Sequence, residues 1–276
     1  MTVPTQARQR SNDGPRTYPW PPQPPHEMEL LSVTSAMKSL NKPFLVGWAA
    51  KTAAECAVED HEIIAAMLKK KDKRAAVDHI KQARFRDSGG KADRGTIVHA
   101  AIEAYVAGKQ VDPAVVQAAL EEKNVPEKLW KATFGMIDGV MEFLFDTEPE
   151  ILWSEDTVYS REHGYAGTPD LIAKIKIGRS KLPAVIDIKS SKAIYNETAM
   201  QLTAYGRADF VGLDDGTEAK LLKNGQPVRH GIVVRPTASG RYERANFDLT
   251  DEVMDRFLAC LTLADAERVF ARARRA

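Results

Sequence analysis

The alternation of apolar and polar positions in residues 184–189 predicts a β-strand near the middle of the chain. The even positions are apolar, and the odd positions include Asp187 and Lys189. Successive side chains of a strand point to opposite faces, so one face can pack into a core while the other carries a carboxylate and an ammonium about 6–7 Å apart. On its own this pattern also fits a surface ion pair, which contributes little to stability.

The preceding segment predicts a second strand and gives Asp187 an acidic neighbour. In residues 171–177 every odd position is apolar, and Asp170 opens the strand on its polar face. If the two strands pair across the turn at residues 178–182, Asp170 and Asp187 converge at one end of the hairpin. Two carboxylates held close repel each other unless a hard cation lies between them, and one that keeps several waters is typically Mg²⁺. The ammonium of Lys189 would face the same site.

Apolar residues spaced three and four apart predict helices along most of the N-terminal half and at the C-terminal end. The predicted helices cover residues 36–40, 44–58, 63–86, 94–108, 113–122, 127–145 and 251–272. Residues 88–90 (Ser-Gly-Gly) are expected to break the helical pattern, and Asp93 is expected to cap the next helix. A further helix is expected to be capped by Asn196 and to place Gln201 and Tyr205 on one face.

The remaining strand patterns complete a sheet. Residues 151–161 predict its first strand, and residues 229–247 predict a hairpin with a turn at residues 238–240. We therefore expect an α/β fold in which helices flank a mixed central sheet of roughly five strands, and a helical N-terminal region walls the site.

The chain of 276 residues is long enough for one sizeable core, and we expect one domain with a tail. Residues 1–28 are rich in proline and are expected to be a disordered tail, because they cannot bury enough apolar surface to order themselves. Residues 29–276 would form the domain, with a helical part over residues 29–147 and the sheet within residues 148–276. The composition, 43% hydrophobic and 28% charged, is that of a soluble globular protein.

The net charge of +1 does not by itself indicate a nucleic-acid partner, so a polyanion site would need an uneven distribution of charge. One predicted helix, residues 63–86, is strongly basic. Its cationic side chains are Lys69, Lys70, Lys71, Lys73, Arg74, Lys81, Arg84 and Arg86. These side chains either cover a solvated helix face or neutralise a phosphate backbone, and the sequence leaves both interpretations open.

The two cysteines, Cys56 and Cys260, lie far apart in the sequence, which argues against a disulfide framework and fits a reducing compartment. No apolar run approaches the roughly 18 residues of a membrane helix, and no secretory segment follows the N-terminus. We therefore expect a cytoplasmic protein without membrane contact.

Four short motifs occur in an order that resembles a known nuclease family. In chain order they are Gly95-Thr96-x-x-His99, Pro169-Asp170, Asp187-Ile188-Lys189 and Gln201-x-x-x-Tyr205. The middle two resemble the signature of the PD-(D/E)XK nuclease superfamily. The outer two resemble its RecB-like exonuclease branch, which includes phage and CRISPR-associated RecB-like exonucleases. The catalytic motif alone is a weak signal, but four motifs in this order over about 110 residues are hard to obtain by accident.

The resemblance implies a restriction-endonuclease-like core and a metal-dependent phosphodiester hydrolase. Its cofactor would be Mg²⁺ or Mn²⁺, and the iron–sulfur cluster that some relatives hold with four cysteines is not expected in a chain with two. The implied metal ligands are His99, Asp170, Asp187 and the carbonyl oxygen of Ile188. The implied catalytic residues are Asp170, Asp187 and Lys189, with Lys189 orienting or helping to deprotonate the attacking water.

The same resemblance implies that Gln201 and Tyr205 bind a substrate phosphate and that Glu155 approaches the metal or its waters. Each side chain also has a plainer interpretation. A lone histidine beside an apolar stripe, such as His99, is more often a packed structural residue. An acid on a strand, such as Glu155, often contacts only solvent, and so do side chains on the polar face of a helix, such as Gln201 and Tyr205. Glu103, one turn after His99, either fixes the tautomer of the imidazole or faces water.

The resemblance favours an exonuclease that degrades DNA from a free end in phage-type replication, recombination or repair, in a bacterial or phage-infected cytoplasm. A recombination or replication protein is a possible partner. The alternatives are an endonuclease of the same fold, a catalytically inactive nucleic-acid-binding protein, and an unrelated scaffold in which the motif arises by chance. The sequence leaves open the polarity of cleavage, the strand preference, DNA against RNA, the number of metal ions and the oligomeric state.

Overall fold

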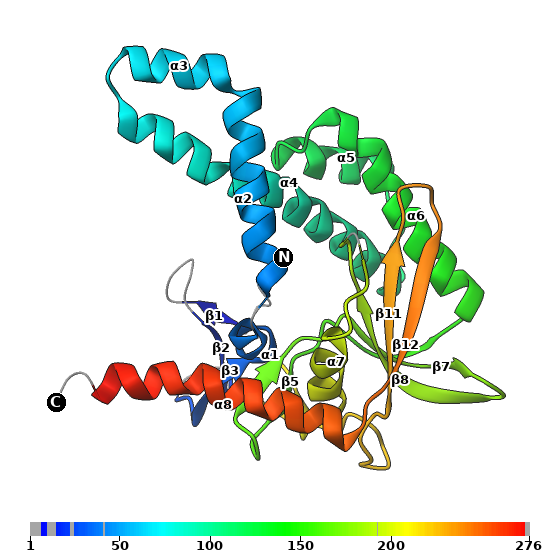
Figure 1. The fold of residues 1–276 in the computed structure, drawn as a ribbon. Helices are drawn as coiled ribbons and strands as arrows, with labels where there is room; N and C mark the ends of the chain where they lie inside the picture. The colour runs from blue at the N-terminus through cyan, green and yellow to red at the C-terminus, as the bar shows by residue number, and fades with distance from the viewer. Residues whose placement is uncertain (1–6, 10–14, 23–24, 41, 192, 274–276) are drawn as a thin grey trace.

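The computed structural model describes residues 7–9, 15–22, 25–40, 42–191 and 193–273, with only the backbone described for residues 86–92 and 267–273. At its centre is a five-stranded sheet in the order β12-β11-β8-β7-β4 (Figure 1). The strands are β4 (Glu150–Ser154), β7 (Leu171–Ile177), β8 (Ser180–Ile188), β11 (His230–Pro236) and β12 (Tyr242–Asp248). β8 and β11 run parallel and the other neighbours antiparallel, so the predicted mixed central sheet and its two hairpins are confirmed.

Alternate residues of this sheet face two hydrophobic cores. Ala173 and Ile186 pack with α5 (Pro113–Glu122), α6 (Trp130–Thr147) and the last turns of α4 (Lys73–Val106). Ile172 and Val185 pack on the other face with α1 (Val33–Ala36), α7 (Thr198–Gly206) and α8 (Asp251–Ala273). Because helices cover both faces, a polar side chain at the end of β8 is held in the interior of the protein.

A second sheet, which the sequence did not predict, shares the core formed by α1, α7 and α8. Its order is β1-β2-β3-β6-β5-β9-β10. Its strands are β1 (Arg8–Gln9), β2 (Arg16–Trp20), β3 (Met28–Ser32), β5 (Val158–Ser160), β6 (Tyr165–Gly167), β9 (Phe210–Gly212) and β10 (Glu218–Ala219). The prediction of one strand over residues 151–161 is wrong, because β4 and β5 belong to different sheets and the chain turns between them at Glu155.

Part of the N-terminal segment forms strands of this second sheet, contrary to the expected disordered tail. β2 pairs with β3, and Tyr18 and Trp20 are each only 2% exposed. The indole ring of Trp20 packs on the rings of Tyr159 and Phe210, with centroids 4.8 and 5.1 Å away. These aromatic side chains supply buried apolar surface, although the composition of the tail as a whole is poor in apolar residues. The same prediction for residues 1–6, 10–14 and 23–24 lies outside the described residues.

The predicted break at residues 88–90 is also wrong. α4 runs without interruption from Lys73 to Val106, and its cap is Asp72 rather than Asp93, because the Asp72 carboxylate accepts a hydrogen bond from the N–H of Ala75 at 2.9 Å. Two glycines cost a helix interior about 2 kcal/mol. The turns on either side offset this cost by packing against α2 (Pro43–Glu59) and α6. At α7, Glu197 rather than Asn196 occupies the N-cap position, and its side chain makes no capping hydrogen bond.

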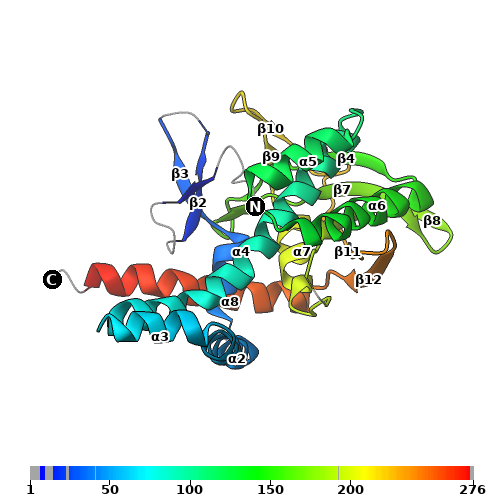
Figure 2. The ribbon, with the colours of Figure 1, turned by 90° about the horizontal axis from the view of Figure 1, so that it is seen from above.

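Three helical segments project from the sheet-containing body: α2, α3 (His61–Lys69) and the first half of α4 (Figures 1 and 2). α4 links this projection to the body, since its last turns line the first core. The basic segment that the sequence singled out within residues 63–86 lies in the projection. None of the described helices is both long and apolar enough to cross a lipid bilayer.

Candidate active site

Asp170 and Asp187 lie opposite each other at one end of the β7–β8 hairpin. The strand register pairs Leu171 with Ile186, so the next position outward sets Asp170 opposite Asp187. Asp170 is fixed there because its Oδ2 accepts a hydrogen bond from the backbone N–H of Ile188 at 2.5 Å. The hairpin therefore brings together the two acids that the sequence singled out.

His99 reaches the same place from α4. Its Nδ1 lies 3.5 Å from Asp170 Oδ1 and 3.9 Å from Glu155 Oε1. The potential ligand atoms of these three residues all lie within 4.8 Å of one another. The helix can come this close because position 95 is glycine, where an added Cβ would lie 2.9 Å from Oγ of Ser190. The glycine of the Gly-Thr-x-x-His motif thus has a packing role that the sequence alone did not reveal.

Glu155 is placed by the turn between the two sheets. Its φ of +57° is in the left-handed region, which is uncommon for a residue with a Cβ, and its N–H donates to the carbonyl oxygen of Asp170 at 3.1 Å. Burial raises the pKa of Glu155 to about 8, and neighbouring acids, first among them Asp170, add to the effect. An unusual backbone conformation together with a strongly raised carboxyl pKa is typical of functional sites. Glu103, in contrast, is exposed.

Asp187 and Lys189 form an ion pair that is largely inside the protein, so the surface-pair interpretation is wrong. Asp187 is 2% exposed. Burial raises its pKa, the ammonium of Lys189 opposes that change, and the charge of Asp170 adds to it. The ammonium donates to Asp187 Oδ1 at 2.9 Å. Asp187 Oδ2 also lies 2.9 Å from the ammonium nitrogen, so both carboxylate oxygens contact the ammonium.

Gln201 on α7 contacts both members of this ion pair, and Tyr205, one helical turn further on, contacts Gln201. The Gln201 amide donates to Asp187 Oδ1 at 3.3 Å and to the Tyr205 hydroxyl at 3.1 Å, while its oxygen accepts from Lys189 at 3.4 Å. Tyr205 is 2% exposed and fits beside Gly167, where an added Cβ would lie 2.5 Å from Cε1 of the ring. The polar face of α7 therefore points at the acidic cluster, and the interpretation that these two side chains meet only solvent is wrong.

The Asp187–Lys189 ion pair lies beside the group formed by His99, Glu155 and Asp170. Together they place three carboxylates, an imidazole and an ammonium at one end of the hairpin. Oxygen and imidazole ligands suit divalent ions such as Mg²⁺ and Mn²⁺. The placement of Asp170 and Asp187 at the same end of the hairpin supports the fit of a cation, since carboxylates held close repel each other unless a cation lies between them. The role of the Ile188 carbonyl oxygen as a metal ligand stays a prediction.

No protein-family model matches the chain, and no curated protein matches it. Among solved structures, the crystal structure of LHK-Exo in complex with dAMP matches over 67% of this chain and 90% of that chain, with 12% sequence identity and a TM-score of 0.28.

Proposed function

We propose that this protein is a divalent-metal-dependent nuclease that hydrolyses phosphodiester bonds of DNA. The observation that carries the proposal is the convergence of three acids, which come from different strand ends and turns. They are Asp170, Asp187 and Glu155, and they meet one histidine, His99, and one lysine, Lys189. Chance placement of D-X-K on a surface strand would leave these side chains apart and in water. Here Asp187 is buried. Burial is the main cause that raises its pKa and that of Glu155, and the negative charge of Asp170 adds to both changes.

Asp170, Asp187, Glu155 and His99 would hold the ion, with the carbonyl oxygen of Ile188 as a further proposed ligand. When bound, Mg²⁺ or Mn²⁺ supplies Lewis-acid stabilisation of negative charge on phosphate oxygens and favours ionisation of a water. The α4 helix sets the position of His99 through its close contact at Gly95. These residues would thus bind and orient the ion.

Lys189 would neutralise charge on the scissile phosphate and orient the attacking water. Its ammonium is held by Asp187 and Gln201 while its side chain stays 28% exposed, so it can still reach a substrate. Gln201 fixes both partners of this pair. Since Tyr205 is almost fully buried and contacts Gln201, we propose that it positions Gln201 rather than touching DNA.

The basic projection offers a surface for the phosphate backbone. All of its described lysines and arginines in α3 and the start of α4 are exposed, which leaves their charges available to DNA as well as to water. On the resemblance of the four motifs we propose end-dependent degradation of DNA, of the kind used in phage-type replication and recombination. An endonuclease of the same fold is the alternative.

The proposal is tested with end-labelled linear DNA and covalently closed circular DNA, each incubated with the purified chain and Mg²⁺, Mn²⁺ or EDTA. We expect metal-dependent loss of the linear DNA and survival of the circle. Nicking of the circle would favour the endonuclease. Asp187→Asn should abolish cleavage, and Asp248→Asn, a carboxylate change on the exposed edge strand β12, should not. DNA binding without cleavage under all metal conditions would refute the nuclease and leave an inactive binding protein.

A further inference from the structure

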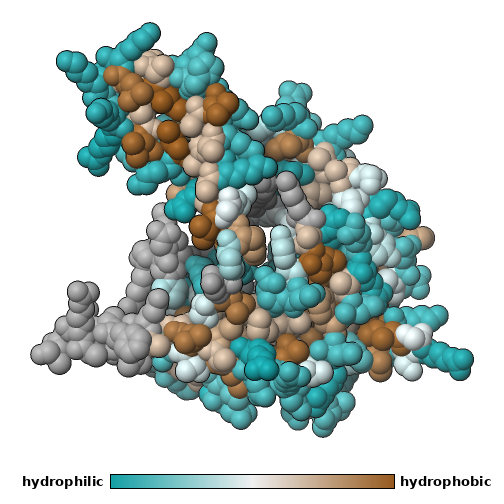
Figure 3. Space-filling view, in the orientation of Figure 1, coloured by the Kyte–Doolittle hydropathy of each residue, from teal (hydrophilic) through white to brown (hydrophobic). Residues whose placement is uncertain are grey.

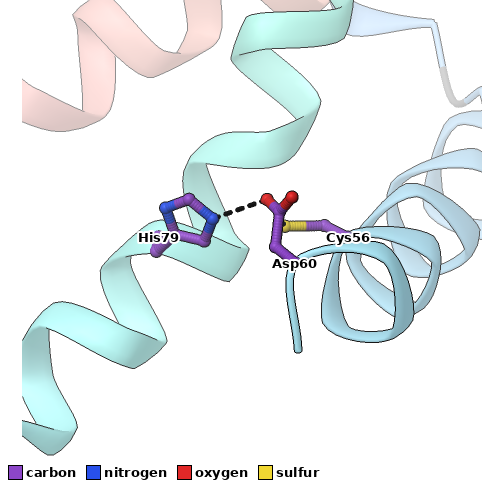
Figure 4. A group of neighbouring side chains, drawn as sticks. All are labelled: Cys56, Asp60 and His79. Atoms are coloured by element: carbon purple, nitrogen blue, oxygen red, sulfur yellow. Dashed lines mark hydrogen bonds and ion pairs between the residues drawn. The ribbon is translucent and has the colours of Figure 1, made fainter. Parts of the chain in front are cut away.

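A second group of possible metal ligands lies in the helical projection. Cys56, Asp60 and His79 each offer one ligand atom, and these atoms lie within 4.8 Å of one another (Figure 4). The Cys56 thiol donates to Asp60 Oδ2 at 3.4 Å, and His79 Nε2 lies 2.6 Å from the same oxygen. His79 and His99 are on the same continuous helix twenty residues apart, which separates the two groups by about 30 Å along the helix.

Three segments of the projection meet at this group. Cys56 is in the last turn of α2, and Asp60 follows the end of α2, with its backbone N–H donating to the carbonyl of Cys56 at 2.9 Å. Asp60 is also the residue before α3 begins. His79 comes from α4, which packs back against both α2 and α3. Figure 4 shows the imidazole directed at the carboxylate, with the thiol on the far side of it.

The projection has almost no hydrophobic core to hold these helices together. Among the described side chains of residues 43–85, the buried ones are Cys56, Ala76 and Ala83, and all three are small. Its large exposed apolar side chains are Phe44, Leu45, Val46, Val58, Ile63, Leu68, Val77 and Phe85. Figure 3 shows hydrophobic surface, in brown, on the projection. Small units that bury little apolar area usually depend on a metal ion or another cross-link.

We propose that Cys56, Asp60 and His79 form a Zn²⁺ site that cross-links α2, α3 and α4. Thiolate sulfur, imidazole nitrogen and carboxylate oxygen are the ligand types that zinc takes, and solvent can fill the fourth position beside the partly exposed Asp60. Tetrahedral zinc with bonds of about 2.0–2.3 Å sets its ligands about 3.3–3.8 Å apart. The sulfur–oxygen distance already fits, and the nitrogen–oxygen distance needs to open by less than about 1 Å, which a small side-chain rotation provides.

Zinc binding replaces the two contacts to Asp60 Oδ2 with bonds to the metal. The thiol proton of Cys56 passes to solvent, and His79 binds as the neutral imidazole. A thiolate ligand selects zinc over the hard ions proposed for the acidic cluster, so the two sites would differ in metal preference. The competing interpretation is a hydrogen-bonded Cys–Asp–His contact that binds no metal.

The test uses the full-length, reduced, chelator-treated protein and titrates it with Co²⁺ as a spectroscopic substitute for Zn²⁺. A cobalt–thiolate bond gives a charge-transfer absorption in the near ultraviolet that oxygen and nitrogen ligands do not give. We expect this band with one thiolate per chain in the wild type, in Cys260→Ser and in Asp170→Asn, and its loss in Cys56→Ser. His79→Gln should weaken Co²⁺ binding at this site by at least about tenfold. Zn²⁺ should remove the band and excess Mg²⁺ should not.

Hydrogen exchange gives the second readout. Zn²⁺ should slow amide exchange in α2 and α3 of the wild type but not of Cys56→Ser. A wild-type protein with a native circular-dichroism spectrum that shows no thiolate band at saturating Co²⁺ would overturn the proposal, as would a band of equal intensity in Cys56→Ser. Neither result depends on whether the acidic cluster cleaves DNA.

Discussion

Glu155→Gln removes a carboxyl group whose ionisation is unfavourable in the folded protein. Burial and the nearby acids raise the pKa of Glu155 from 4.5 to about 8. Between these two pH values the folded state binds a proton that the unfolded state has released. The contribution of Glu155 to stability is therefore fully present below about pH 4.5 and is lost as the pH rises through about 8.

The size of the effect follows from the pKa difference and the exposure of the side chain. The difference between 4.5 and about 8 corresponds to roughly 5 kcal/mol at full weight. Because the Glu155 side chain is 31% exposed, solvent screening reduces this to about 2 kcal/mol. Gln is uncharged and similar in shape, and both residues share the strain of the positive φ, so the variant lacks only the ionisation.

Urea unfolding in EDTA at pH 5, 7 and 9 measures this difference. We predict that the free energies of unfolding of the wild type and Glu155→Gln agree at pH 5, and that the variant is more stable by about 2 kcal/mol at pH 9. Glu162→Gln, which changes an exposed carboxylate, should follow the wild type. Adding Mn²⁺ should stabilise the wild type more at pH 9 than at pH 6, and the variant much less at either. Parallel pH curves for wild type and Glu155→Gln would refute the reasoning.

Three further substitutions test other parts of the account. Asp187→Asn should lower the metal-dependent cleavage rate by at least about 10²-fold. The metal-free variant should be as stable as the wild type at pH 8, because burial disfavours the charged form of Asp187 and Asn carries no charge. A lower urea midpoint for the variant would argue against that cause. Gly167→Ala should lower the free energy of unfolding by about 1–3 kcal/mol and slow cleavage, because the new methyl group collides with the ring of Tyr205. The matched change Gly47→Ala, at an open helix position, should raise the free energy of unfolding by about 0.5–1 kcal/mol. Equal urea midpoints for the two variants would contradict this. Trp20→Ala should cost about 3–5 kcal/mol in thermal or urea unfolding, and a neutral effect would return the N-terminal segment to the disordered tail expected from its composition.

The parts of the fold that the sequence predicted are those fixed by neighbours in the chain. The β7–β8 hairpin follows from strict alternation and a short turn, and its register then places Asp170 opposite Asp187 without further information. The helices α5 and α6 follow in the same way from their apolar stripes. His99 was found through its motif rather than through any pattern of polarity.

The parts that the sequence did not predict depend on contacts between distant segments. Strands of three residues, such as β5, β6 and β9, are too short to show alternation, and β3 pairs with β6 from far along the chain. The turn at Glu155 is visible only once the two sheets are placed. The helix through residues 88–90 is continuous because tertiary packing outweighs the local preference of glycine. His79 and Asp60 are 19 residues apart, and no motif in the sequence marks them as neighbours.

The nuclease that we propose requires the acidic cluster at the end of the β7–β8 hairpin to hold a divalent cation. The most direct measurement is the anomalous scattering of Mn²⁺ in a crystal of the full-length protein grown with the metal. We predict a peak within bonding distance of the Asp170 and Asp187 carboxylates and next to the imidazole of His99. Saturating Mn²⁺ that leaves no peak among these side chains, or places its strongest peak elsewhere on the chain, would contradict the account.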